Sequence, residues 1–241
     1  MNKAKNKLRC IHRHTIDEHP SCFYKGLIKY PTDKLFEKYS GQLWYNYPDY
    51  RIGYLDIEVD NLNADFGTVL SWCIKEKGGE LYSSVITKKE LFGEIDVDKR
   101  LVKELIKTMK KFKIIIGYNS TNFDLPYIRT KALRYNFDFP GFKLVKNSDD
   151  SFSNVPELFH FDLYFTVRSK LRLSSKSLAN VCDYLKIPGK TPIDKDVWRL
   201  AKYGNEQALK TVLEHNRYDV IILEKLHELL EPIRKWIRTP L

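Results

Sequence analysis

Three short stretches of the sequence place carboxylates where they could bind divalent metal ions. Asp56 and Glu58 are two residues apart in a β-rich run, so both would point to one face of a strand. Neighbouring carboxylates repel each other and are costly to bury, but a divalent cation removes that cost, and hard oxygen ligands suit Mg²⁺ or Mn²⁺. The alternative is an exposed strand face, against which the flanking apolar residues Leu55, Ile57 and Val59 argue.

Asp124 is the second candidate. It follows an apolar run, Ile114–Ile116, and the polar segment Gly117–Asn122, and it precedes Leu125-Pro126-Tyr127-Ile128. The pattern predicts a buried strand that ends at a turn, and a helix with an acid in its first turn. Such an acid can also serve the free backbone N–H groups of the helix start, and the two roles are compatible.

His215 and Asp219 form the third candidate. They are four residues apart in a helical region, so they lie one turn from each other on one face. This spacing pairs a candidate general base with a candidate metal ligand. Standing alone, the two residues would favour a surface His–Asp pair over a functional one.

The elements that must position these residues follow from hydrophobic periodicity. We expect three strands joined by short turns, a helix, a strand and a second helix, over residues 51–59, 66–74, 80–86, 98–112, 113–118 and 125–135. This βββαβα order, followed by further helices, predicts an α/β fold with a mixed sheet flanked by helices. A row of lysines on the first helix is interpreted as a solvated face: Lys99, Lys103, Lys107 and Lys110.

The second half of the chain is less regular. Residues 136–157 are expected to be a loop, and 159–167 form an apolar run that contains Asp162. A helix capped within Ser174–Ser177 is expected to run to about Leu185, and a long helix covers roughly 206–230.

Composition favours a nucleic-acid partner. There are 41 Lys and Arg against 31 Asp and Glu, a net charge of +10, which suits a polyanion but also a general solubility role. The sequence has no run of 18 apolar residues and no apolar segment after its basic start, so we expect neither a membrane span nor a secretory signal. These features predict an intracellular, cytoplasmic protein, which could associate with the nucleoid. Cys73 and Cys182 lie in apolar contexts and are expected to be buried, reduced thiols.

Residues 1–50 differ in composition from 51–241 and are interpreted as a separate Cys/His-rich extension. Five candidate zinc ligands occur within thirteen residues, and four of them could form a tetrahedral structural Zn²⁺ site: Cys10, His12, His14, His19 and Cys22. The alternative is a polar tail with unrelated histidines.

The ordered segments resemble the proofreading exonuclease domain of family B DNA polymerases, within the DEDD exonuclease superfamily. Similar segments are Tyr54–Glu58, Gly117–Ile128, His160–Tyr164 with Val167-Arg168, Ser177–Ala179 with Val181, and the helix around Asp219. The chain is too short for the polymerase palm and fingers, so it also resembles the stand-alone, RNase H-like predicted exonucleases of this superfamily.

The resemblance implies an RNase H-like domain over residues 51–241 in which Asp56, Glu58, Asp124 and Asp219 hold two Mg²⁺ or Mn²⁺ ions. It implies that Asn119, Ser120 and Phe123 contact terminal nucleotides, and that a two-metal 3′–5′ exonuclease releases nucleoside 5′-monophosphates from single-stranded DNA or RNA. One departure is that His215 occupies the place four residues before the last Asp, where the polymerase branch has Tyr. His215 could therefore deprotonate the attacking water or only position it.

Two alternatives differ from this reading. One is an RNase H-type endonuclease on RNA–DNA hybrids, and the other is a nucleic-acid-binding module with a relic site. An acidic pocket would also need a basic rim to hold a phosphate backbone. Candidates, each of which could equally be a solvated surface charge, are Arg129, Lys131, Arg168, Lys170, Arg172, Lys176 and Lys190.

Overall fold

The protein is described from a computed structural model, which covers residues 9–10, 28–29, 51–93, 95–146, 152–189 and 192–234. Within these residues the central sheet has five strands in the order β5-β4-β3-β6-β9. The strands are β3 (Ile52–Val59), β4 (Val69–Glu76), β5 (Leu81–Val85), β6 (Ile114–Gly117) and β9 (Phe159–Asp162).

The sheet is mixed, as the sequence predicts. β3, β4 and β5 form an antiparallel meander, whereas β6 is parallel to β3 and β9 is parallel to β6. β3 therefore lies in the centre of the sheet with a hydrogen-bonded neighbour on each side. This is the RNase H-like arrangement. The parallel strands β3, β6 and β9 have their carboxyl ends at the same end of the sheet.

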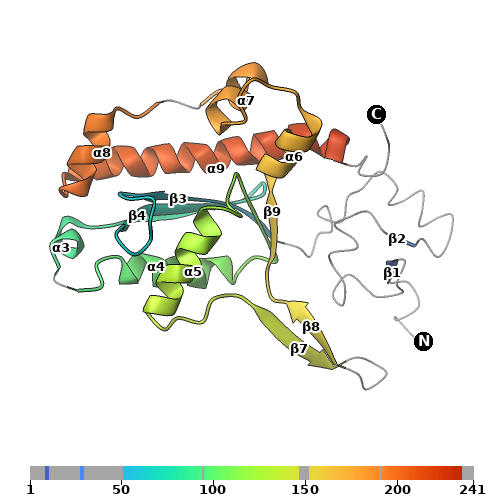
Figure 1. Ribbon diagram of the computed structural model, residues 1–241, viewed down its shortest axis with the longest axis horizontal. Helices are drawn as coiled ribbons and strands as arrows, with labels where there is room; N and C mark the ends of the chain where they lie inside the picture. Colours follow the sequence, from blue (N-terminus) through green and yellow to red (C-terminus); the bar gives the residue numbers. More distant parts are fainter. Residues whose placement is uncertain are drawn as a thin grey trace.

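Helices cover both faces of the sheet (Figure 1). α4 (Lys99–Met109) and α5 (Asp124–Arg134) lie below the sheet in that view, and the long α9 (Glu206–Arg234) crosses above it. α6 (Leu163–Lys170), α7 (Leu178–Tyr184) and α8 (Lys195–Lys202) lie on the same side as α9. One buried hydrophobic cluster joins the sheet to α4, α5, α8 and the first part of α9, and a second joins it to α6, α7 and the later part of α9.

α4 illustrates how periodicity builds this packing. Its predicted apolar face is buried, and its predicted lysine row is exposed. Three links tie the helix start to its surroundings: the Asp98 carboxylate accepts from Val69 N–H at 2.9 Å, bonds the Tyr135 hydroxyl and lies 3.0 Å from Lys131 Nζ. Lys131 also donates to the Gly67 carbonyl at 2.6 Å and is only 6% exposed. Lys131 is therefore a buried structural cation, and its prediction as part of a basic rim is wrong.

The prediction of a loop over residues 136–157 is also wrong in part. It contains an antiparallel hairpin, β7 (Phe142–Lys146) and β8 (Phe152–Pro156), that pairs with neither β6 nor β9. The short helices α3 (Lys88–Leu91) and α8 were not predicted. α7 begins at the expected cap, where the Ser177 hydroxyl accepts from Asn180 N–H, and α9 extends four residues beyond its expected end.

Two of the predictions concern residues that lie largely outside the described ones. The proposed zinc ligands lie there except Cys10, whose backbone forms β1 (Arg9–Cys10) paired with β2 (Ile28–Lys29). Lys190 also lies outside them. In the part of the chain that the structure does describe, no helix is both long and apolar enough to cross a membrane.

Candidate functional site

The first pair of carboxylates lies on the central strand, as predicted. Asp56 and Glu58 are half-buried and point to the face that α9 covers. Cys73 pairs with Asp56 across β3 and β4 and is fully buried. Burial raises the pKa of the Cys73 thiol, and the charges of Asp56 and Glu58 raise it further. Asp56, Glu58 and Cys73 therefore share the face of the sheet that α9 covers.

α9 brings the third candidate to the same place. His215 Nε2 lies 3.9 Å from Glu58 Oε1 and 3.8 Å from Asp219 Oδ2. One ligand atom from each of Glu58, His215 and Asp219 falls within 4.8 Å of the others, a spacing that one cation could bridge. The (i, i+4) spacing on α9 and the register of β3 together produce this group, so neither element forms it alone.

Asp124 joins the group through the backbone of β3. It is 4% exposed, and its Oδ1 accepts from Ile57 N–H, between Asp56 and Glu58, at 3.1 Å. Burial raises the pKa of Asp124 to about 7, and the charge of Asp162 adds to that effect although two backbone N–H bonds oppose it. A buried carboxylate of this kind is stabilised by an adjacent cation. The donor set of carboxylates and one imidazole therefore fits a hard divalent metal ion.

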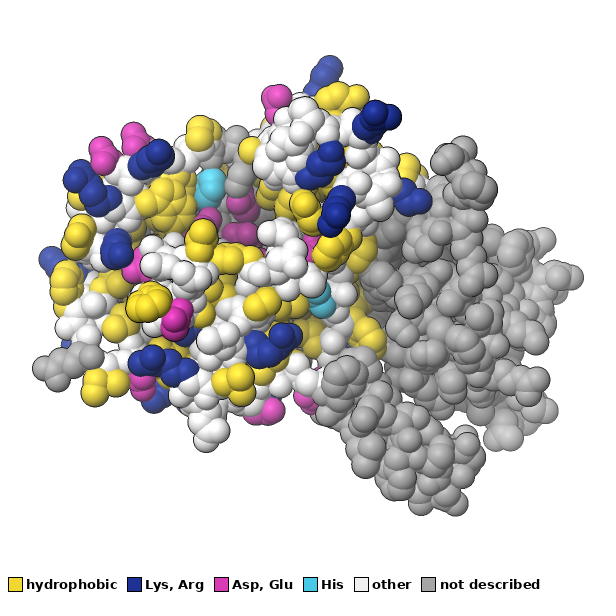
Figure 2. All heavy atoms as spheres, in the orientation of Figure 1, with side chains coloured by type: hydrophobic (Ala, Val, Ile, Leu, Met, Phe, Trp, Pro, Cys, Tyr) yellow, Lys and Arg dark blue, Asp and Glu magenta, His cyan; other side chains and the backbone are white. Residues whose placement is uncertain are grey.

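The four acids are not equivalent in the geometry. Glu58 and Asp219 lie together with His215, Asp124 is tied to Ile57, and Asp56 is placed by strand alternation on the same face as Glu58. Figure 2 shows this region as a hollow in which acidic side chains gather beside a histidine.

A tight turn links β6 to α5 and presents Asn119 and Phe123. Asn119 has φ 58°, in the left-handed region that asparagine tolerates better than most residues. A Cβ on Gly117 would meet Ser120 Oγ at 2.2 Å, so a larger residue there would displace the turn. Phe123 is half-buried and its ring packs 5.8 Å from that of Tyr127.

Asp162, which the sequence places in an apolar run and in one of the segments of the family resemblance but not among the candidate site residues, holds this turn in place. Its Oδ1 accepts from Asn119 N–H at 2.7 Å and from Tyr164 N–H at 3.0 Å, and its Oδ2 accepts from Thr121 N–H at 2.9 Å. The carboxylate thus caps α6 and fixes the turn with the same two oxygens. The signal in the sequence for this role is a single acid placed between two apolar residues, Phe161 and Leu163.

Ser120 has a different environment from its neighbours. It is fully buried, and its hydroxyl lies 2.8 Å from His160 Nε2. Burial lowers the pKa of His160 to about 4, so the imidazole is neutral at pH 7. The Ser120 side chain therefore faces β9 rather than the open site, whereas Asn119 and Phe123 remain accessible to a substrate.

An open pocket of about 410 Å³ adjoins the turn. It is lined by Tyr118, Asn119, Tyr164, Lys176, Ser177 and Leu178. The Tyr118 hydroxyl donates to the Lys176 carbonyl at 2.6 Å and so connects the turn to the segment before α7. Three exposed cations lie at the end of α6 and just after it: Arg168, Lys170 and Arg172. Figure 2 shows Lys and Arg side chains over α6 and α7.

Comparison with known proteins agrees with the fold. A family model described as the RNase_H superfamily matches residues 53–231. A DNA polymerase of Methanocaldococcus jannaschii is 29% identical over 174 residues, covering 66% of this chain and 10% of that protein. A DNA polymerase of Archaeoglobus fulgidus is 27% identical over 155 residues, covering 59% of this chain and 19% of that protein.

Among solved structures, the family B DNA polymerase of Pyrobaculum calidifontis aligns with a TM-score of 0.59 and 22% identity. The alignment covers 77% of this chain and 25% of that one. The chain thus spans only a small part of the relatives that it matches. Since the family model covers most of the chain and includes all four predicted acids and His215, the protein belongs to the RNase H superfamily and resembles its DEDD exonuclease branch.

Proposed function

We propose that this protein is a metal-dependent nuclease that acts as a 3′–5′ exonuclease on single-stranded DNA or RNA and releases nucleoside 5′-monophosphates. The convergence of Glu58, His215 and Asp219 within 4.8 Å is the observation that supports it most strongly. The group joins the central strand β3 to α9, two segments far apart in the sequence, and its carboxylates and imidazole are of the types that bind divalent ions and move protons.

The acids would hold two Mg²⁺ or Mn²⁺ ions, with Asp56, Glu58, Asp124 and Asp219 as ligands. Two such ions supply Lewis-acid activation of water and neutralise the charge that develops on the phosphate. In the reaction, a water oxygen attacks phosphorus, the bond to the 3′-oxygen breaks, and that oxygen takes a proton.

His215 is the candidate for handling the attacking water. Its Nε2 faces the oxygens of Glu58 and Asp219, so a water beside it would lie next to the metal ligands. A neutral imidazole there accepts a proton or orients the water through a hydrogen bond. Because the tyrosine of the polymerase branch could only orient it, His215 widens the chemistry available to this chain.

The turn after β6 would hold the strand end. Asn119 offers a side-chain amide at a fixed left-handed position, and Phe123 offers a half-exposed ring against which a terminal base can stack, worth about 1–3 kcal/mol per base. The pocket lined by Tyr118, Tyr164 and Ser177 lies beside Asn119 and is open enough for a neighbouring nucleotide.

An RNase H-type endonuclease has the same fold and is the closest alternative, and a binding module with a relic site is the second. Product mapping separates all three. On a 5′-labelled single strand with Mn²⁺, the exonuclease predicts products that shorten one nucleotide at a time from the 3′ end, and a 3′-phosphate or inverted terminal nucleotide should block them. Internal cuts in a 5′-labelled RNA strand paired with DNA, made despite the terminal block, would favour the endonuclease. No turnover of either the single strand or the hybrid in any metal would favour the relic site.

A further inference from the structure

The outer edge of β5 is the feature that the nuclease site leaves unused. Among the described residues, β5 pairs with β4 on one side and with no strand on the other. An edge of this kind presents unpaired backbone groups to any extended chain that approaches it. Folded proteins usually shorten, charge or cover such edges, so its surroundings indicate what it accepts.

The register shows which groups face outward. Ile86 N–H donates to the Leu70 carbonyl and Glu76 N–H donates to the Glu80 carbonyl, both at 2.8 Å. Because hydrogen-bonded pairs alternate with non-bonded pairs in an antiparallel ladder, Ser84 and Tyr82 bond β4. The amide groups of Leu81, Ser83 and Val85 therefore turn to the outer edge, in the two-residue repeat that an added strand requires.

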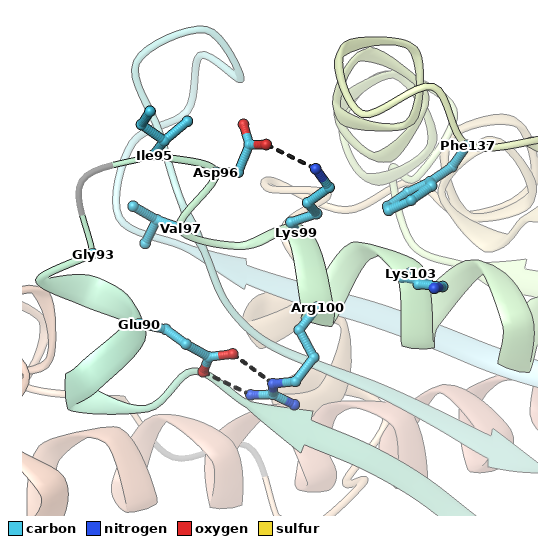
Figure 3. A pocket seen from close by; sticks show the side chains of 9 residues that line it. All are labelled: Glu90, Gly93, Ile95, Asp96, Val97, Lys99, Arg100, Lys103 and Phe137. Carbon is cyan, nitrogen blue, oxygen red and sulfur yellow. Dashed lines mark hydrogen bonds and ion pairs between the residues drawn. The ribbon is translucent and has the colours of Figure 1, made fainter.

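One of these groups is already used. The Val85 carbonyl accepts from Arg100 Nη2 at 2.9 Å, and Arg100 is itself held by two bonds to Glu90, at 2.6 and 2.9 Å (Figure 3). The Val85 end of the edge is thus closed by a fixed side chain. Among the described residues, the backbone N–H and C=O groups of Leu81 and Ser83 accept and donate no hydrogen bond.

A pocket of about 650 Å³ runs along this edge and is rich in cations. It is lined by Trp72, Leu81, Tyr82, Ser83, Ser84, Glu104, Lys107, Thr108, Lys111 and Arg217. Arg217 is partly neutralised by Glu214 at 3.2 Å, and Glu104 is engaged by Arg100 at 2.9 Å. Lys107 and Lys111 are both exposed, and no salt bridge joins either to another described residue, so they give the pocket an excess of positive charge.

Trp72 adds a directional group to this pocket. Its side chain is 4% exposed, and its indole N–H is a buried donor without an acceptor among the described residues. An indole N–H can only donate. The exposed lysines and the outward amides together match a ligand that carries both carboxylates and an extended backbone.

We propose that β5 is a docking edge for an extended acidic segment of a partner protein, which adds to the sheet as a strand and places carboxylates against Lys107 and Lys111. A nucleic-acid strand would satisfy the lysines but not the repeat of backbone donors and acceptors at Leu81 and Ser83. The proposal concerns the far edge of the sheet from β9 and does not depend on the nuclease activity.

Synthetic peptides test it on the full chain. The probe alternates Val or Thr with Asp or Glu, and its controls replace the acids by Lys or methylate every second backbone nitrogen. Amide chemical shifts and fluorescence anisotropy report binding. We expect shifts centred on Leu81, Ser83 and Val85, and at least about tenfold weaker binding for both control peptides.

Charge reversal on the protein completes the test. Lys107→Glu with Lys111→Glu should weaken binding of the acidic probe at least about tenfold, because it removes two exposed cations that form no salt bridge with a described residue; Lys111 Nζ lies only over the Tyr82 ring, at 4.6 Å. Lys103→Glu is the matched control, since Lys103 lies one turn earlier on α4 and lines a different pocket with Phe137 (Figure 3). Thermal unfolding checks that each variant folds.

Four results would overturn the proposal: no binding of any acidic probe, equal binding of the methylated peptide, shifts elsewhere on the protein, or a single-stranded oligonucleotide that displaces the probe from β5. Equal loss in the Lys103→Glu variant would likewise show that only general charge is sensed.

Discussion

At the scale of single residues, the account depends on carboxylates that a strand and a helix bring to His215. Alternation on β3 and the four-residue spacing on α9 were readable in the sequence, so Glu58 and Asp219 could be predicted to share a face with Asp56 and His215 respectively. That the two faces meet within 4.8 Å could not be predicted from spacing, because it depends on how α9 crosses the sheet.

Replacement of His215 tests its role directly. We expect His215→Ala to lower kcat by about 10²–10⁴ with little change in KM, because proton transfer or water positioning is lost while the strand end is still held. His215→Tyr should recover part of kcat if His215 mainly positions water. Steady-state kinetics on a labelled single strand gives both values, and an unchanged kcat in His215→Ala would contradict any role for this residue.

Long-range partners are the residues for which sequence reasoning was least informative. Lys131 was assigned to a basic rim but is a buried partner of Asp98, 33 positions earlier in the chain. Ser120 was assigned to the substrate, yet its hydroxyl contacts His160 on a neighbouring strand. The first pair depends on how α4 and α5 pack side by side, and the second on the pairing of β6 with β9, neither of which a local pattern encodes.

At the scale of elements, the turn between β6 and α5 depends on a carboxylate from β9. Asp162→Ala removes the acceptor for the N–H groups of Asn119, Thr121 and Tyr164. We expect a loss of about 2–4 kcal/mol in the free energy of unfolding, measured by urea titration, together with faster amide exchange at Asn119 and Thr121. Asp194→Ala, which removes only the exposed cap of α8, should cost about 1 kcal/mol. Equal losses in the two variants would show that Asp162 is a helix cap alone.

The Ser120–His160 contact predicts how stability changes with pH. The folded pKa of His160 is lowered to about 4 from an ordinary value near 6.5, so the unfolded state takes up its proton first as the pH falls. This contribution is complete above about pH 6.5 and is lost as the pH falls toward 4, by at most about 3 kcal/mol. Between pH 7 and pH 4.5, the free energy of unfolding should therefore fall further in the native protein than in His160→Gln. Identical pH dependence in both would contradict the assignment.

Elements with strong periodicity were predictable, and short ones were not. The three-strand meander, α4 and α9 have regular apolar patterns, whereas α3 and α8 are only four and eight residues long. The hairpin β7–β8 stands apart from the central sheet, so its residues lack the continuous apolar runs that identify buried strands.

At the scale of the whole molecule, a divalent cation that binds the folded protein through Glu58 and Asp219 must stabilise it. We expect Mn²⁺ at about 100 times its Kd to add roughly 2.7 kcal/mol to the free energy of unfolding, seen as a rise in Tm. Glu58→Gln with Asp219→Asn should remove the rise, while Asp183→Asn, on the exposed side of α7, should keep it. A rise that survives the double substitution would place the ion elsewhere.

For the N-terminal fifty residues, the structure describes only the β1–β2 pair, and the other predictions for this segment rest on the sequence. The zinc site of Cys10, Cys22 and two of the histidines stays a prediction, and it concerns a structural ion separate from the ions proposed for the acidic site.

The most direct test of the central claim is release of mononucleotides from a single-stranded substrate in Mn²⁺ by the native chain and by two variants, Asp56→Ala and Asp124→Ala. These residues are contributed by β3 and by the start of α5, and a shared metal site requires both. The account predicts that each variant keeps its fold and loses at least about 10³-fold of the activity, whereas Asp183→Ala keeps it. Full activity in both variants would contradict the account.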